Sequence, residues 1–263
     1  MGKKMQKQKA ILFDATLCIG CGACYEACKE QNKLPETNDD FLKDHLSAST
    51  YTVVEEYGDV YTRKMCMHCV DPTCVSVCPV GAFTKTDLGP VIYDPEKCLG
   101  CRYCMQACPH KIPRYEWNKT NPRVRKCIMC YDRIVKGEQT ACAEACPTGA
   151  TIFGDRDDLI QEAKKRIAED PDSYYPEIYG LKEAGGTNVL ILSPVPFDQL
   201  GYAELSVEAM PNYTMQALEK IPTVVSVGSV FLGGMYWLTK RKNEIAKENK
   251  LSNTKGKDNN ENT

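Results

Sequence analysis

Residues 18–28 read CIGCGACYEAC, and this short stretch decides what kind of fold the chain can form. Its four cysteines are separated by two, two and three residues, and residues 98–109 repeat the spacing as CLGCRYCMQACP. All sixteen cysteines of the 263-residue chain lie before residue 147, and they divide into four groups. The groups are Cys18, Cys21, Cys24 and Cys28; Cys66, Cys69, Cys74 and Cys78; Cys98, Cys101, Cys104 and Cys108; and Cys127, Cys130, Cys142 and Cys146.

The spacing within each group indicates metal binding. Cysteines so close in sequence are better placed to bind one metal centre together than to form disulfides between distant loops. This argues against a secreted disulfide scaffold. A cubane iron–sulfur cluster needs one thiolate at each iron corner, and a Cys-x-x-Cys-x-x-Cys loop supplies three of them. The fourth cysteine starts to leave on a helix, so it is expected to ligate a neighbouring cluster. Because no ligand position lacks its cysteine, the sequence predicts four clusters, all [4Fe–4S].

Structural zinc is the main alternative to iron–sulfur clusters. Structural zinc sites use two pairs of ligands with a longer gap between the pairs. In three of the groups, such a site would leave a closely spaced cysteine without a metal to bind. The fourth group, with eleven residues between Cys130 and Cys142, could pass for a zinc site if read alone. Because the cysteine set is complete, His68 and His110 are predicted to lie near the clusters or at the surface without acting as ligands. His45 is predicted to be solvated.

The remaining pattern predicts an α+β fold of tandem two-cluster ferredoxin-like units. Lys9–Phe13 and Tyr57–Met65 are predicted strands, and Asp157–Glu169 is a predicted amphipathic helix. Gly81–Lys85 and Pro90–Tyr93 are predicted to form a hairpin.

A weak internal repeat supports duplication of a two-cluster unit. Asp14 and Asp94 each stand four residues ahead of a Cys-x-x-Cys-x-x-Cys run. Cysteine disappears after Cys146, and this change of composition predicts a boundary near residues 147–154. We therefore expect a polar N-terminus (1–8), a four-cluster domain (9–155) and a helical and extended region (156–220).

The C-terminal region predicts one membrane-spanning helix. Residues 221–239 carry no charge over nineteen positions and end at Lys240-Arg241-Lys242. At about 1.5 Å per residue this run can just cross a hydrocarbon core of about 30 Å. A buried helix of a soluble protein is the alternative, but Tyr236 and Trp237 lie near one end, where an aromatic belt is expected. Residues 240–263 are predicted to be a disordered tail.

Charge predicts the orientation of that helix in the cytoplasmic (inner) membrane. Basic residues follow the helix far more often than they precede it, so the tail is expected in the cytoplasm and the cluster domain on the periplasmic side. Residues 1–8 are polar and basic without a following apolar run, which indicates neither a secretory nor a twin-arginine signal. We therefore expect the folded domain to be exported together with a partner that carries a twin-arginine signal.

Several segments resemble one known family. They are Cys66-Met-His-Cys69, Lys126-Cys-Ile-Met-Cys130-Tyr-Asp132-Arg133 and Cys142-Ala-Glu-Ala-Cys146-Pro147. With the four groups, they make residues 9–155 similar to the four-cluster iron–sulfur (beta) subunits of membrane-bound respiratory oxidoreductases, of the formate dehydrogenase and uptake hydrogenase type. The resemblance implies a relay of electrons from a catalytic subunit, of molybdopterin or nickel–iron type, to a membrane cytochrome b or quinone-reactive subunit.

The same resemblance implies which cysteines share a cluster. Group one is expected to pair with group four, and group two with group three. The implied quartets are Cys18, Cys21, Cys24 and Cys146; Cys127, Cys130, Cys142 and Cys28; Cys66, Cys69, Cys74 and Cys108; and Cys98, Cys101, Cys104 and Cys78.

Other function classes fit the sequence less well. A stand-alone polyferredoxin carrier is the main alternative, but a diffusing carrier needs neither the apolar helix nor its basic flank. An assembly or scaffold protein with structural zinc is a second alternative function. The net charge of −2 with no broad basic face gives no reason to expect nucleic acid. The chain shows no pairing of a base with a nucleophile, so we expect an electron-transfer subunit without a catalytic site of its own.

Overall fold

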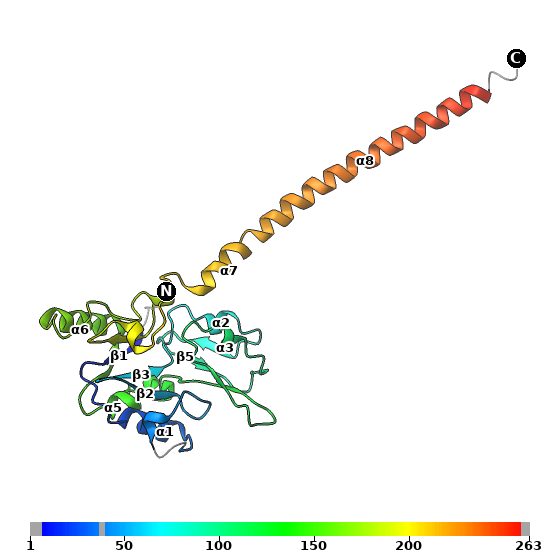
Figure 1. Cartoon of the computed structure of the whole chain (residues 1–263). Coiled ribbons are helices and arrows are strands. Elements are labelled where there is room, and N and C mark those ends of the chain that lie inside the picture. Colours follow the sequence, from blue (N-terminus) through cyan, green and yellow to red (C-terminus); the bar gives the residue numbers. More distant parts are fainter. Residues whose placement is uncertain (1–6, 37–39, 259–263) are drawn as a thin grey trace. The chain divides into compact units, whose positions relative to one another are not determined.

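The computed structural model describes residues 7–36 and 40–258, with side chains described up to residue 249 (Figure 1). The chain divides into two units, Met1–Pro211 and Asn212–Thr263. We call them the core unit and the C-terminal unit. All sixteen cysteines belong to the core unit.

A three-stranded sheet lies at the centre of the core unit. β1 (Lys9–Asp14) pairs antiparallel with β8 (Thr151–Asp155) and parallel with β9 (Val189–Leu192). Five of the six residues of β1 are buried, because both faces of the strand are covered. Such two-sided burial explains why its sequence, KAILFD, is apolar without alternation.

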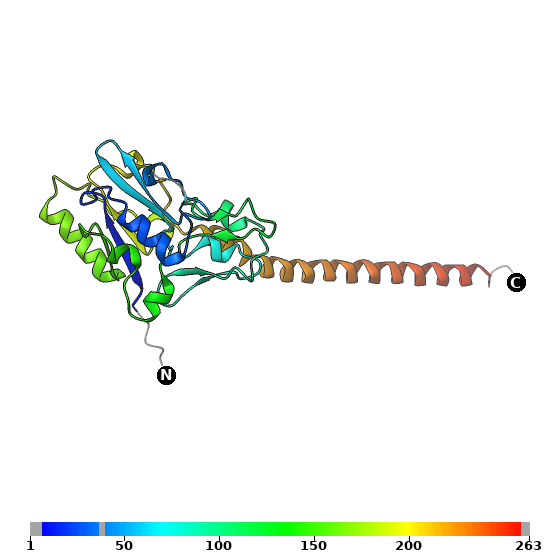
Figure 2. The ribbon, with the colours of Figure 1, turned by 90° about the horizontal axis from the view of Figure 1, so that it is seen from below.

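The two faces of β1 pack against different parts of the chain. On one face, Leu12 joins a cluster with Leu159 and Ala163 of α6 (Arg156–Glu169). Figure 2 shows α6, in lime, beside β1, in dark blue. On the other face, Ile11 and Phe13 join a cluster with three buried cysteines, Cys66, Cys127 and Cys142, and three half-buried ones, Cys18, Cys24 and Cys108. The sheet thus separates a helical cover from the cysteine-bearing segments.

Short elements carry or support the cysteines. The helices are α1 (Ala23–Asn32), α2 (Thr73–Ser76), α3 (Tyr103–Ala107), α4 (Tyr131–Val135) and α5 (Ala141–Glu144). The two-stranded hairpins are β2 (Thr52–Tyr57) with β3 (Val60–Met65), β4 (Phe83–Lys85) with β5 (Val91–Tyr93), and β6 (Arg114–Tyr115) with β7 (Val124–Arg125). α1 packs against α5, and α2 packs against α3. These two helix pairs decide where the cysteines meet.

Most local predictions are confirmed. The strand from Lys9, the strand that ends at Met65, the hairpin at residues 81–93 and the helix at residues 157–169 all form. The predicted boundary near residue 155 is wrong, because β9 belongs to the central sheet and the core unit continues to Pro211. β9 pairs with β1, which lies almost 180 residues earlier in the chain. Because Pro194 and Pro196 follow β9 closely, the sequence around this strand resembled a linker.

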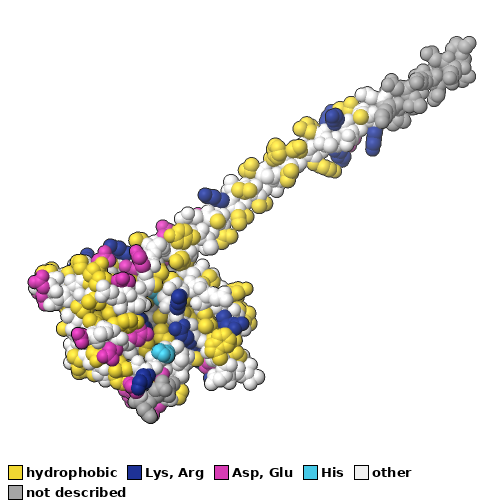
Figure 3. Space-filling view, in the orientation of Figure 1, with side chains coloured by type: hydrophobic (Ala, Val, Ile, Leu, Met, Phe, Trp, Pro, Cys, Tyr) yellow, Lys and Arg dark blue, Asp and Glu magenta, His cyan; other side chains and the backbone are white. Residues whose placement is uncertain are grey.

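The C-terminal unit is helical. α7 (Met210–Leu218) is followed by α8 (Ile221–Asp258). The helix Met210–Asn249 is long and apolar enough to cross a membrane, by length and composition alone, and none of its apolar window is buried. Figure 3 shows hydrophobic side chains distributed along it.

The predicted disordered tail is helical over most of its length. α8 continues beyond residue 239 to Asp258, because this stretch is rich in Lys and also contains Arg and Glu, which favour helix. Lys240 and Glu244, one turn apart, also form an ion pair at 4.0 Å. Residues 259–263, and residues 1–6 of the predicted polar N-terminus, lie outside the described residues.

The position of β9 generates a stability prediction. Val189 is 1% exposed, whereas Val207 is 67% exposed. We expect Val189→Ala to lower the free energy of unfolding by about 2 kcal/mol, through lost burial and an unfilled cavity. Val207→Ala, which removes the same atoms at the surface, should change it by less than about 0.5 kcal/mol. Urea unfolding of the two variants measures the difference, and equal effects would show that β9 is not part of the core.

Candidate metal-cluster sites

Cysteines from different sequence groups meet at four places, which we call sites A to D. All four cysteines of site A line one cavity, and all four of site B line another. At sites C and D the cysteines are electrostatic neighbours of one another. Site A is Cys18, Cys21, Cys24 and Cys146; site B is Cys28, Cys127, Cys130 and Cys142; site C is Cys66, Cys69, Cys74 and Cys108; and site D is Cys78, Cys98, Cys101 and Cys104.

The paired helices explain this exchange of cysteines between groups. α1 carries Cys24 and Cys28, and the chain at α5 carries Cys142 and Cys146. Each helix gives one cysteine to site A and the other to site B. α2 and α3 repeat the arrangement, so that Cys74 and Cys108 lie in site C while Cys78 and Cys104 lie in site D.

Backbone N–H groups point at the sulfurs. The amides of Met129, Gly100 and Ala82 donate to the Sγ atoms of Cys127 at 3.2 Å, Cys98 at 3.4 Å and Cys78 at 3.2 Å. Such donors stabilise negative charge on thiolate sulfur. The loops therefore favour thiolate sulfur at these cysteines.

Close packing also fixes the loop of site A. Gly20 has φ +67°, and a Cβ there would lie 2.6 Å from the ring of Tyr61. Any other residue would have to displace this ring or leave the left-handed backbone conformation.

The four sites follow one another in a fixed order. Cys24 of site A neighbours Cys142 of site B, and Cys127 of site B neighbours Cys66 of site C. Cys74 of site C in turn neighbours Cys104 of site D. The order along the core unit is therefore A, B, C, D.

The quartets are too open for one metal ion. Among residues 7–36 and 40–258, no three His, Cys, Asp or Glu side chains lie close enough to hold a single ion. A tetrahedral zinc site needs four ligands around one ion. Four thiols per site, with backbone N–H donors toward several of the sulfurs, fit an iron–sulfur cube.

Comparison with known proteins agrees with this geometry. Residues 59–156 match the 4Fe-4S dicluster domain, and residues 10–32 match a 4Fe-4S binding domain. The hydrogenase-2 operon protein HybA of Shigella flexneri is 41% identical over 239 residues, covering 74% of this chain and 73% of that protein. The formate dehydrogenase-O iron–sulfur subunit of Escherichia coli is 38% identical over 204 residues, covering 72% of this chain and 67% of that subunit.

The chain belongs to this family of iron–sulfur subunits. The resemblance inferred from the cysteine segments is thereby confirmed. The iron–sulfur subunit is an electron-transfer protein with [4Fe–4S]-binding domains and a mixed α/β fold.

Burial controls the chemistry of the thiols. Desolvation raises the pKa of Cys28, Cys74 and Cys104 to about 12. At neutral pH such thiols are protonated when no metal is bound. Binding of a cluster must therefore displace their protons.

The three histidines differ in their surroundings. His68 is fully buried, and its Nδ1 accepts a hydrogen bond from the Val91 amide at 2.9 Å. Burial holds the pKa of His68 well below its usual range and lowers that of His110 to about 4, so both rings are neutral at physiological pH. His45 is exposed, as predicted.

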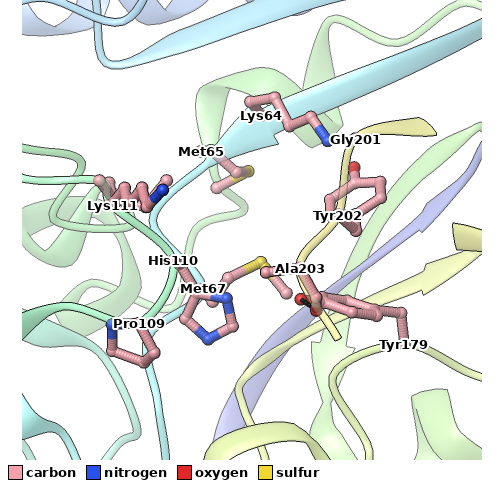
Figure 4. Close-up of a pocket in the computed structure, with 11 residues that line it drawn as sticks. Lys64, Met65, Met67, Pro109, His110, Lys111, Tyr179, Gly201, Tyr202 and Ala203 are labelled. Atoms are coloured by element: carbon pink, nitrogen blue, oxygen red, sulfur yellow. Dashed lines mark hydrogen bonds between the residues drawn. The ribbon is translucent and has the colours of Figure 1, made fainter. Parts of the chain in front are cut away.

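A cavity of about 300 Å³ adjoins site C (Figure 4). Its walls include Met65 and Met67, which flank Cys66, and His110, two residues after Cys108. The rings of Tyr179 and Tyr202 close the other side, with centroids 4.9 Å apart.

Three buried or half-buried cations near the sites escaped the sequence reasoning. Arg63 and Lys126 are 3% and 4% exposed, and Lys85 is half-buried. Lys85 Nζ donates to the carbonyl oxygens of His68 and Cys69. In the sequence, the position of Lys126 directly before Cys127 is the signal that could have predicted a cation near a site.

The exchange of cysteines between helices generates a spectroscopic prediction. Cys142 and Cys146 are four residues apart, but they lie in sites B and A. We expect Cys146→Ser to alter the same electron paramagnetic resonance (EPR) signal as Cys18→Ser, while Cys142→Ser alters the signal changed by Cys28→Ser. Spectra of the four reduced variants test this, with each pair serving as the control for the other. If Cys142→Ser and Cys146→Ser change one common signal, the exchange is wrong.

The raised thiol pKa values predict how cluster assembly depends on pH. Deprotonation of the buried thiols becomes easier as the pH rises toward about 12. Reconstitution of the metal-free chain with iron and sulfide should therefore be more complete at pH 8.5 than at pH 6.5. Absorbance of the brown product measures the yield, and an equal or higher yield at the lower pH would contradict the expectation.

Proposed function

We propose that this chain is the electron-transfer subunit of a membrane-bound respiratory oxidoreductase, relaying electrons between a catalytic subunit and a membrane cytochrome b or quinone-reactive subunit. The row of four cysteine quartets in the order A to D carries the proposal. When bound there, four [4Fe–4S] clusters would supply a series of one-electron carriers. The sixteen cysteines would be their ligands, four to each site.

The burial of the quartets supports a relay with two open ends. Cys127 and Cys142 of site B and Cys66 of site C are buried, so the protein keeps water away from the middle of the row. Cys21 of site A and Cys101 of site D are exposed. Electrons would therefore enter at one end and leave at the other, where partner proteins can approach.

Apolar side chains beside both ends support docking of partners. Ile19, next to site A, is 62% exposed, and Leu99, next to site D, is 72% exposed. The relatives, a hydrogenase-2 operon protein and a formate dehydrogenase subunit, support a catalytic partner of hydrogenase or formate dehydrogenase type. We propose that this partner is a nickel–iron or molybdopterin subunit.

Membrane attachment is proposed through the apolar part of α8. Its composition permits a single span, and the basic residues after residue 239 favour a cytoplasmic C-terminus with the core unit on the periplasmic side. A diffusing polyferredoxin would have no use for such a segment.

A truncation after Lys220 tests the proposal. We expect the shortened chain to keep about sixteen irons and sixteen sulfides (four cubes of four), but to leave the membrane fraction and to lose donor-dependent quinone reduction. A tag after Thr263 in the full chain should resist external protease in spheroplasts. Retention of the shortened chain on membranes with unchanged quinone reduction would contradict the role of the helix. About half the iron in the full chain would contradict the four clusters.

A further inference from the structure

Arg63 is a buried cation without a carboxylate partner among the described residues. It lies in β3 and is 3% exposed. Its Nε donates to Thr52 Oγ1 at 2.8 Å, and its Nη1 lies 3.4 Å from Thr151 Oγ1. These partners are neutral, so they satisfy the guanidinium's hydrogen bonds without balancing its charge. Burial of an unbalanced charge is strongly unfavourable, which means that another negative group must be nearby.

The cysteine sulfurs of sites A and B are the negative groups available to Arg63. Its side chain lines the cavity of site B together with Cys28, Cys130 and Cys142. Its hydrogen-bond partner Thr52 also lines the cavity of site B, and its partner Thr151 lines the cavity of site A. Desolvation raises the pKa of Cys24 in site A and of Cys28 in site B, and the positive charge of Arg63 opposes the rise in both. One guanidinium therefore serves two neighbouring sites.

Lys126 stands in a similar relation to site C. It is 4% exposed, and its Nζ donates to the carbonyl oxygens of Val91 at 2.6 Å and Cys127 at 2.8 Å. No carboxylate pairs with it in the part of the chain that the structure describes. Its Nζ lies 5.8 Å from the centre of the Phe83 ring, and Phe83 and Val91 belong to the hydrophobic cluster against which Cys74 of site C packs. The two buried cations thus act on different parts of the row.

We propose that Arg63 and Lys126 are internal counterions that raise the reduction potentials of the clusters, Arg63 at sites A and B and Lys126 at site C. The inference rests on the proposed four-cluster function. Each added electron makes a thiolate-bound cluster more negative, and a fixed cation in a poorly polarisable interior stabilises the reduced form. Site D is the internal reference for Arg63, and site A is the internal reference for Lys126.

Neutral and charge-retaining variants separate this role from a structural one. Arg63→Gln and Lys126→Gln remove the charge, while Arg63→Lys and Lys126→Arg keep it. All four are compared with the natural chain by iron content and by EPR-monitored redox titration. Signals of sites A and B are assigned from the cysteine variants described above, and those of sites C and D from Cys66→Ser and Cys101→Ser. We expect Arg63→Gln to lower the equilibrium constant for reduction of the clusters at sites A and B about tenfold. This corresponds to a fall of about 59 mV in reduction potential for one electron. The site D signal should stay unchanged, and Arg63→Lys should restore most of the shift.

Lys126→Gln should show the complementary pattern: the reduction potential of site C should fall, while that of site A stays unchanged. It also tests the inference if Arg63→Gln does not assemble its clusters. Potentials that stay unchanged in fully loaded neutral variants, or that fall equally at all four sites, would overturn the counterion role while leaving the relay intact. A natural chain with fewer than four clusters would instead overturn the proposed function.

Discussion

Two cysteines one helical turn apart cannot easily bind the same cube when a loop has already filled three of its corners. One turn of helix advances about 5.4 Å along its axis, so Cys24 and Cys28 face different spaces. Every cysteine group in this chain ends with such a pair. The only way to complete each quartet is to place a second helix of the same kind alongside, and α1 with α5 and α2 with α3 do this. The rest of the core unit can be understood as support for these two contacts.

The support is mainly the central sheet. β1 leads directly into the first cysteine loop, and β8 follows directly from Cys146, so their antiparallel pairing holds both ends of site A. Asp14, the last residue of β1, stabilises the start of the first cysteine loop. Its carboxylate accepts hydrogen bonds from Arg166 and Tyr174, each at 2.9 Å. β9 then covers the remaining edge of β1. Arg63, on the β2–β3 hairpin, hydrogen-bonds to Thr151 of β8 and lines the cavity of site B.

The cysteine pattern was enough to predict the metal chemistry, the family and the local elements near the loops, because spacing along the chain directly limits which ligands can share a cube. It could not predict that residues 186–211 complete the core unit. The VLIL run of β9 is short and is followed by Pro194 and Pro196, and its parallel pairing with β1 depends on contacts far away in sequence. Arg63 was equally hidden, since its burial depends on where the β2–β3 hairpin lies relative to Cys142. The order of the four sites also required the structure, because neighbours such as Cys127 and Cys66 lie in groups that the pairing of cysteines keeps apart.

The central claim is that four metal clusters lie in a row, each held by cysteines from two sequence groups. An anomalous difference map at the iron absorption edge, from crystals of the intact subunit grown without oxygen, tests it most directly. The account predicts four iron peaks in the order A to D, with the Sγ atom of Cys146 beside the same peak as that of Cys18, and that of Cys78 beside the same peak as that of Cys101. Fewer peaks, or a peak surrounded by all four cysteines of a single sequence group, would contradict it.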